Sequence, residues 1–190
     1  MITGYTYPYI RVVDQLNITC AITLPQAPVA GVQQNVTALW DTGAQITCIS
    51  QTLAARLNLL PQGSTRINGA NNQPFQVNEY SVQLIMGNFV IPFLMVAELD
   101  MQNTGHDVII GMDVISKGDL TITNFNGRTV LTFREPSLET INYVDEIDLF
   151  NRCLRVHNIN EAHHIQHDKC DCGSGKDFKN CHGKSKYNRA

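Results

Sequence analysis

The stretch Ala38-Leu39-Trp40-Asp41-Thr42-Gly43-Ala44 decides how the rest of the chain is interpreted. An apolar run leads to one carboxylate, and small residues follow it at once. This order predicts a strand that ends at Asp41 and presents its side chain on a tight turn. Gly43 permits a positive φ or a close backbone approach, and the hydroxyl of Thr42 can brace the turn.

A second motif, Asp107-Val108-Ile109-Ile110-Gly111-Met112-Asp113, follows after a strand-like region. The two motifs together resemble those of retropepsin-like (retroviral-protease-like) aspartic proteases. The resemblance implies an all-β protein with a closed, β-barrel-like monomer and short helices. It also implies that Asp41, Thr42 and Gly43 are catalytic. The alternative is an aspartate that caps a turn in an ordinary β protein.

Length and composition limit the other possibilities. The 190 residues, of which 43% are hydrophobic, suit one domain with or without a small appendage. A net charge of −3 does not favour a nucleic-acid binder. No apolar run approaches the roughly 20 residues that span a bilayer, and the N-terminus lacks a secretory-signal pattern. We therefore expect a cytoplasmic protein that does not contact a membrane.

Periodicity outlines the predicted domain over residues 1–136. Ser50 should begin a short helix that ends near Leu57, and Asn126-Gly127 should form a hairpin turn. A second short helix is expected near residues 112–116. Strands are predicted over residues 8–24, 32–40, 45–49, 81–86, 89–99, 119–124 and 128–134.

Residues 65–80 predict a further hairpin with Gly69-Ala70-Asn71-Asn72 at its tip. In the resembling family this position holds the flap, a mobile hairpin that closes over the substrate. A plain surface hairpin is the alternative. By the same resemblance, the substrate-binding residues would be Ala44, Gly69, Ala70, Asn71, Ile109 and Ile110. Apolar residues flanking the cleaved bond are therefore a plausible preference.

Beyond the protease-like region, residues 137–166 predict a helix or linker. Apolar residues there recur near helical spacing. Four histidines lie in or next to this segment, and a polar linker explains them better than a metal site. They are His157, His163, His164 and His167.

The tail over residues 167–190 contains Cys170, Cys172, Cys181 and His182. Three thiolates and one imidazole complete a tetrahedral zinc site, and a closed four-ligand set indicates structural rather than catalytic zinc. The segment resembles the SEC-C zinc motif, which serves as a docking element in the bacterial preprotein translocase motor. From residue 169 onward, the sequence contains six Lys or Arg and only two Asp. By resemblance, this basic tail could dock a protein partner or the ribosome.

One Asp-Thr-Gly motif is half of an aspartic protease site. The chemistry needs two carboxylates that share one proton around a water molecule, and no cofactor takes part. A symmetric homodimer would place Asp41 opposite Asp41 of its mate. The sequence therefore predicts a homodimeric aspartic endopeptidase that acts on polypeptides. The alternatives are a non-catalytic peptide-binding dimer and an adaptor that works through the zinc tail.

Overall fold

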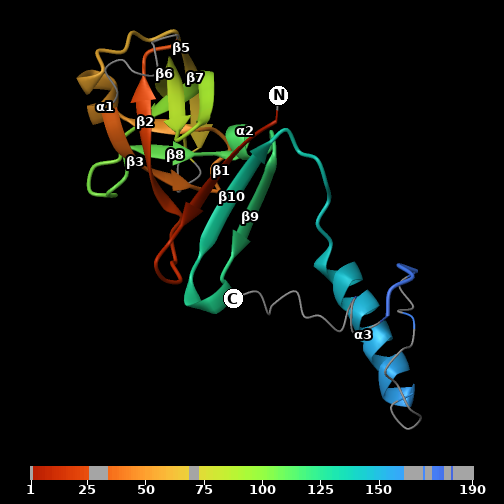
Figure 1. Cartoon of the computed structure of the whole chain (residues 1–190). Helices are drawn as coiled ribbons and strands as arrows, with labels where there is room; N and C mark the ends of the chain where they lie inside the picture. Colours follow the sequence, from red (N-terminus) through yellow and green to blue (C-terminus); the bar gives the residue numbers. More distant parts are fainter. Residues whose placement is uncertain are drawn as a thin grey trace. The chain divides into compact units, whose positions relative to one another are not determined.

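The computed structural model describes residues 2–25, 34–68, 73–160, 169, 173–177 and 181. It divides into two compact units, Met1–Glu139 and Thr140–Ala190. The first contains the strands and two short helices, and the second contains one long helix (Figure 1). In the described part of the chain, no helix is both long and apolar enough to cross a membrane.

The elements follow one another along the chain with few helical interruptions. In order, the structure contains β1 (Thr3–Pro8), β2 (Asn17–Thr23), β3 (Gln34–Trp40), β4 (Cys48–Ser50), α1 (Gln51–Arg56), β5 (Gly63–Asn68), β6 (Pro74–Met86), β7 (Phe89–Leu99), β8 (Val108–Ile110), α2 (Met112–Ile115), β9 (Asp119–Thr123), a 3-10 turn (Phe125–Gly127), β10 (Val130–Glu135) and α3 (Tyr143–Asn160).

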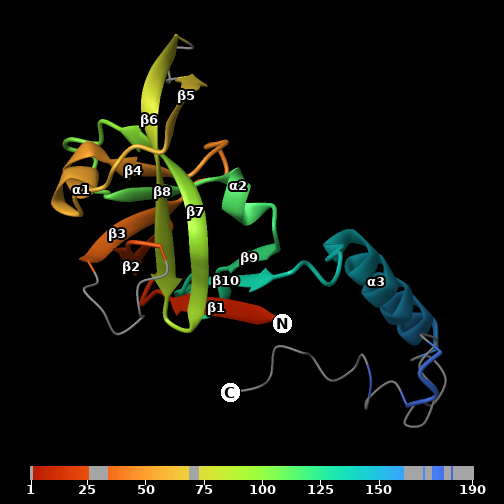
Figure 2. The same ribbon diagram turned by 90° about the horizontal axis from the view of Figure 1, so that it is seen from above.

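The larger sheet closes on itself. Among the described strands its order is β2-β3-β8-β4-β7-β6-β5, and β2 also pairs with β6. Six strands therefore form a closed barrel, while β5 stays outside it and pairs only with the outer half of β6. Figure 2 shows β6 running from the barrel into this projecting hairpin. The all-β, closed-barrel expectation is confirmed.

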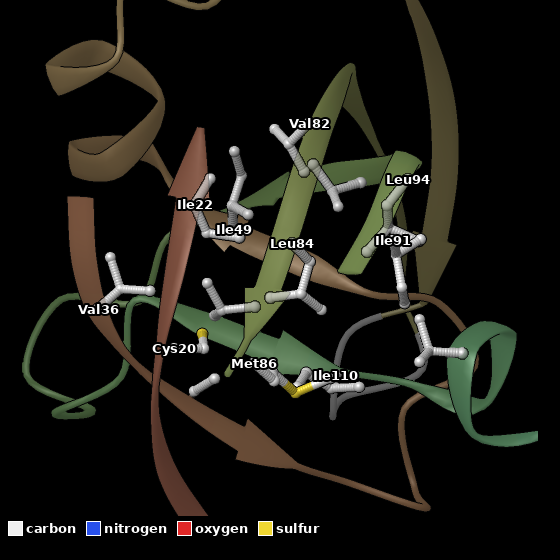
Figure 3. Packing of buried hydrophobic residues seen from close by; sticks show 14 of the residues in the cluster. Cys20, Ile22, Val36, Ile49, Val82, Leu84, Met86, Ile91, Leu94 and Ile110 are labelled. Carbon is white, nitrogen blue, oxygen red and sulfur yellow. The ribbon is translucent and has the colours of Figure 1, made fainter. Parts of the chain in front are cut away.

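Alternating apolar side chains fill the barrel. Ile22, Ile49 and Leu84 are almost fully buried and come from three different strands. Figure 3 shows such side chains converging from β2, β4, β6 and β8 on one interior. The α1 helix begins at Ser50, whose hydroxyl accepts the Leu53 N–H as a cap, and it buries Leu53 and Ala54 against the same core.

A second, three-stranded sheet has the order β1-β10-β9. One of its faces packs on the barrel through Leu131 and Phe133, which are fully buried. The Phe133 ring lies 5.1 Å from the ring of Trp40 and 5.5 Å from that of Phe89. This sheet thus supports the residue that directly precedes Asp41.

The predicted strand over residues 8–24 is wrong in its first half. Strand β1 already ends at Pro8, and β2 begins at Asn17. Between them the backbone turns around buried Thr129, which bonds Tyr9, Arg11 and Val13. Ile10 is consequently 92% exposed, despite the apolar pattern around it. Of the two options for the segment after β10, the structure shows a helix, α3.

Candidate active site

Asp41 follows directly on β3, and the turn holds its carboxylate. Strand β3 runs parallel to β8 with Trp40 opposite Ile110. The Asp41 N–H donates to the Ile110 carbonyl at 3.0 Å. The Gly43 N–H donates to Asp41 Oδ1 at 2.8 Å, and the Ala44 N–H donates to the Asp41 carbonyl at 3.2 Å. Strands β3 and β8 and the tight turn therefore hold the half-exposed Asp41 in place, and Thr42 is exposed beside it.

Gly111 lets the second motif pass against the segment that follows the turn. A Cβ built on Gly111 would lie 2.6 Å from the carbonyl carbon of Ile46 and 3.0 Å from the nitrogen of Thr47. No side chain fits at that distance. Close contact continues on the next residue, since the Met112 N–H donates to the Ala44 carbonyl at 2.8 Å. The two sequence motifs therefore form one structural unit.

The hydroxyl of Thr47 bridges these two segments, and no sequence pattern indicates this bridge. Thr47 is fully buried. Its oxygen accepts the Gly111 N–H at 3.1 Å, and its hydroxyl donates to Asp113 Oδ1 at 2.7 Å. The partners are more than sixty residues apart in the chain, so only the fold brings them together. Asp113 serves this bridge at the start of α2.

The candidate substrate-binding residues fall into three groups. Ile110 is fully buried in the main core, whereas Ile109 keeps partial exposure. Ala44 lies on the active-site turn and is also partly exposed. Gly69, Ala70 and Asn71 lie outside the described residues, at the tip of the predicted hairpin. The hairpin itself is confirmed by antiparallel pairing of β5 with β6.

An apolar cluster lies between this hairpin and the second motif. Its partly buried members are Ile46, Ile67, Val77, Leu99 and Ile109, packed around Cys48, Ala97 and Met101. Ile67 comes from β5 and Val77 from β6, opposite Phe75 and Thr65 in the ladder. The hairpin thus presents apolar side chains to the same cluster that contains Ile109.

The base of the hairpin is tied to the barrel by a polar cluster. Glu98 on β7 accepts hydrogen bonds from the Tyr80 hydroxyl and from Asn78 Nδ2, the latter at 2.9 Å. Burial, and then the hydrogen bond to Glu98, raise the pKa of Tyr80. Both donors come from β6, so the cluster anchors the strand where it leaves the barrel.

The buried thiols of Cys20 and Cys48 do not offer a nucleophile. Burial, with the nearby Asp107 as a second cause, raises the pKa of Cys20 to about 12. Burial, and then Asp113, raise that of Cys48 to about 11. Both thiols are therefore protonated near neutral pH, and a thiol attacks only as its thiolate.

The predicted zinc ligands are described only in part. Cys170, Cys172 and His182 lie outside the described residues. Cys181 is half-buried, and its Sγ lies 3.3 Å from the Ser174 hydroxyl. Gly173 and Gly175 have φ values of +77° and +69°, which suit the tight turns of a small metal loop. Zinc binding stays a prediction, and the donor set of three thiols and an imidazole fits it.

Residues 26–114 match the family described as aspartyl protease. The matched segment contains both motifs and extends from residue 26, before β3, into α2. Members of the family are peptidases, so the comparison supports a peptidase. No curated protein matches the chain.

Solved structures similar to this chain include a retropepsin-like aspartic protease from Rickettsia conorii. It is 11% identical with a TM-score of 0.44, and the match covers 71% of this chain and 96% of that one. The retroviral protease-like domain of Ddi1 from Leishmania major is 18% identical, with a TM-score of 0.33 and coverages of 64% and 93%. A foamy viral protease-reverse transcriptase is 15% identical, with a TM-score of 0.38, over 81% of this chain and 18% of that one.

Proposed function

We propose that the protein is a homodimeric aspartic endopeptidase whose active site contains Asp41 from each of two chains. The observation that carries the proposal is the geometry of the Asp41 turn. Hydrogen bonds to β8 and to the Gly43 N–H hold a half-exposed carboxylate at the end of a barrel strand. Aspartates that only cap a turn make the same bond, so the match of residues 26–114 to aspartyl proteases adds support for catalysis.

The chemistry follows from two carboxylates that share one proton. Like charges a few ångströms apart cannot both ionise, so the pair retains a proton. The ionised Asp41 removes a proton from the bound water, whose oxygen attacks the peptide carbonyl carbon. The partner's Asp41, protonated, donates to the carbonyl oxygen. Breakdown of the tetrahedral intermediate then passes a proton to the leaving amine. The titration belongs to the pair, not to either residue.

The substrate class follows from the apolar cluster beside the turn. Ile109, the hairpin residues Ile67 and Val77, and Ile46, which follows Ala44 by two positions, belong to one apolar cluster. An extended peptide held between the hairpin and β8 would place side chains against these residues. We therefore expect apolar residues on at least one side of the cleaved bond.

The C-terminal segment is proposed to fold around one structural zinc ion held by Cys170, Cys172, Cys181 and His182. When bound, the metal supplies folding free energy to a segment too short for a core of its own. The surplus of Lys and Arg after residue 168 favours an acidic docking partner. Proteolysis does not require this segment in the proposal.

The deciding experiment is digestion of a mixed peptide pool by the purified protein from pH 3 to pH 8, with new termini identified by mass spectrometry. Asp41→Asn keeps the shape of the side chain but removes the carboxylate pair that shares a proton, so cleavage should fall by about 10²–10⁴-fold. Asp14→Asn, at another exposed acid, is the matched control and should cleave normally. Equal cleavage by wild type and Asp41→Asn would refute the proposal. A folded wild-type dimer that binds peptides without cutting them would instead establish a peptide-binding module.

A further inference from the structure

The hairpin of β5 and β6 leaves the barrel at one residue, Glu79. On the barrel side of this position β6 pairs with β7, beginning with Glu79 opposite Ala97. On the other side, among the described strands, β6 pairs only with β5, beginning with Glu79 opposite Gly63. Figure 2 shows this hairpin projecting from the barrel. Because a two-stranded ribbon is marginally stable by itself, contacts at its base decide where it lies.

The carboxylate of Glu98, on β7, joins the two sides of this position. Its Oε2 accepts a hydrogen bond from the Tyr80 hydroxyl at 2.5 Å and another from Asn78 Nδ2 at 2.9 Å. Tyr80 lies on the barrel side, is 6% exposed and packs in the main core. Asn78 lies one position into the hairpin and is exposed. Hydrogen bonds to an ionised acceptor are the stronger kind, so one oxygen ties the hairpin to a residue that the core holds.

Backbone bonds continue from Glu98 to the segments that position the active-site turn. Strand β7 runs parallel to β4, with Glu98 opposite Ile49. The N–H of the preceding residue, Ala97, donates to the Thr47 carbonyl at 3.0 Å. The hydroxyl of Thr47 in turn accepts the Gly111 N–H. The residue that holds the hairpin is therefore part of the framework that also holds the turn.

The hairpin covers an apolar cluster that contains a thiol. Cys48 is 7% exposed and belongs to this cluster, against which Ile67 of β5 and Val77 of β6 pack. If the hairpin lifts from the barrel, these two side chains leave the cluster and Cys48 becomes accessible. The reactivity of Cys48 therefore reports the position of the hairpin.

We propose that Glu98 is a positioning residue that holds the hairpin against the apolar cluster, where it grips a peptide over the Asp41 turn. The inference rests on the proposed function, because it assigns to the hairpin the hold on the substrate. Glu98 touches no reacting atom and acts through Asn78 and Tyr80. Without its carboxylate the hairpin lifts, and a smaller fraction of the molecules is competent to bind peptide. The KM then rises, whereas kcat is unchanged, because a molecule that has bound peptide has the hairpin in place.

The first test follows the hairpin without any proteolysis. Alkylation of Cys48 by iodoacetamide is timed by mass spectrometry, with Cys20 of the barrel core, 4% exposed, as the internal standard. Glu98→Ala should raise the rate at Cys48 about 2–10-fold, as the loss of one or two hydrogen bonds predicts, and leave the rate at Cys20 unchanged. Glu98→Gln keeps an oxygen that can accept both bonds and should react like wild type.

Gln76→Ala is the matched control for this test. It removes an amide from the same strand, but that amide bonds Ser64 within the hairpin, at 2.7 Å, and not the barrel. Its Cys48 should react at the wild-type rate. An unchanged Cys48 rate in Glu98→Ala, or an equal rise at Cys20, would overturn the proposal.

The second test separates positioning from a general loss of structure. Asn78→Ala removes only the hairpin end of the bridge, at an exposed position, so the fold should survive and Cys48 should again react faster. For a peptide that the wild type cleaves, KM should rise about 2–10-fold while kcat stays within about twofold. A fall in kcat at an unchanged KM would contradict the proposed role.

The two tests also separate this inference from the proposed protease. If the wild type cleaves no peptide but Cys48 responds to Asn78→Ala and Glu98→Ala, the protease is refuted and the hold of Glu98 on the hairpin is upheld. If the wild type cleaves peptides and Cys48 responds to neither variant, the protease stands and the role of Glu98 is refuted.

Discussion

Replacing Gly111 by alanine tests whether the two motifs work as one unit. The added Cβ would lie 2.6 Å from the Ile46 carbonyl carbon, about 0.8 Å short of the 3.4 Å at which ordinary contact begins. The close atoms belong to backbone, so no flexible side chain can move aside. The strand that contains Ile110 and the segment after the Asp41 turn must therefore separate.

The structure sets the expected magnitudes. An extra carbon in a well-packed site lowers the free energy of unfolding by about 1–3 kcal/mol. A cost of about 2 kcal/mol lowers the melting temperature by about 4–8 °C for a chain of this size. Because the Ile110 carbonyl holds the Asp41 N–H, the shift also moves the carboxylate. A displacement approaching 1 Å costs about 100-fold in rate.

The assay combines thermal unfolding by circular dichroism with kcat/KM for a peptide that the wild type cleaves. Gly63→Ala is the control, because its Cβ would lie 3.4 Å from the nearest atom, Glu79 Oε2. The free energy of unfolding of Gly63→Ala should stay within about 0.5 kcal/mol of that of the wild type. If Gly111→Ala melts and cleaves like Gly63→Ala, the close approach does not position Asp41, and the reasoning fails.

Three further changes have expected outcomes. Thr47→Val removes the hydroxyl that bridges the Gly111 N–H and the Asp113 carboxylate, so the free energy of unfolding in urea should fall by about 1–3 kcal/mol. Thr47→Ser keeps the hydroxyl and should retain most of that stability. Hydrogen bonds from Ser137, from the Leu138 N–H and from Arg134 hold the pKa of Asp119 below its usual value of 3.8. A lowered pKa gives stability that is present above that value and lost as pH falls below it, so Asp119→Asn should melt earlier than wild type at pH 7 and the gap should close below about pH 4. Metal analysis should find about one zinc ion per chain, lost in Cys181→Ser and kept in Cys153→Ser.

The sequence predicted the parts of the fold that depend on local chemistry. Asn126 and Gly127 have positive φ values, as their hairpin turn requires, and Ser50 caps α1. The strand that leads to Asp41 was expected from its apolar residues. Local patterns failed where distant contacts decide. Residues 9–16 form a loop because their backbone bonds Thr129, more than a hundred positions away.

Part of the active site was also beyond the sequence. The motif identified Asp41, but nothing in the pattern distinguished Thr47 from other strand threonines. Its role depends on Gly111 and Asp113, which the antiparallel pairing of β4 with β8 brings near it. Periodicity likewise treated Ile109 and Ile110 as equivalent. Adjacent strand residues point to opposite sides of the sheet, and the side chain of Ile110 is fully buried in the barrel interior.

Two carboxylates from two chains in one site are the central claim, and mixed dimers test it most directly. Wild type and Asp41→Asn are unfolded and refolded together at a fixed total concentration, with the wild-type fraction varied. If each site needs Asp41 from both chains, activity falls as the square of that fraction, to about one quarter in an equal mixture. Activity proportional to the fraction itself, about one half in that mixture, would show that one chain cleaves alone and would contradict the account.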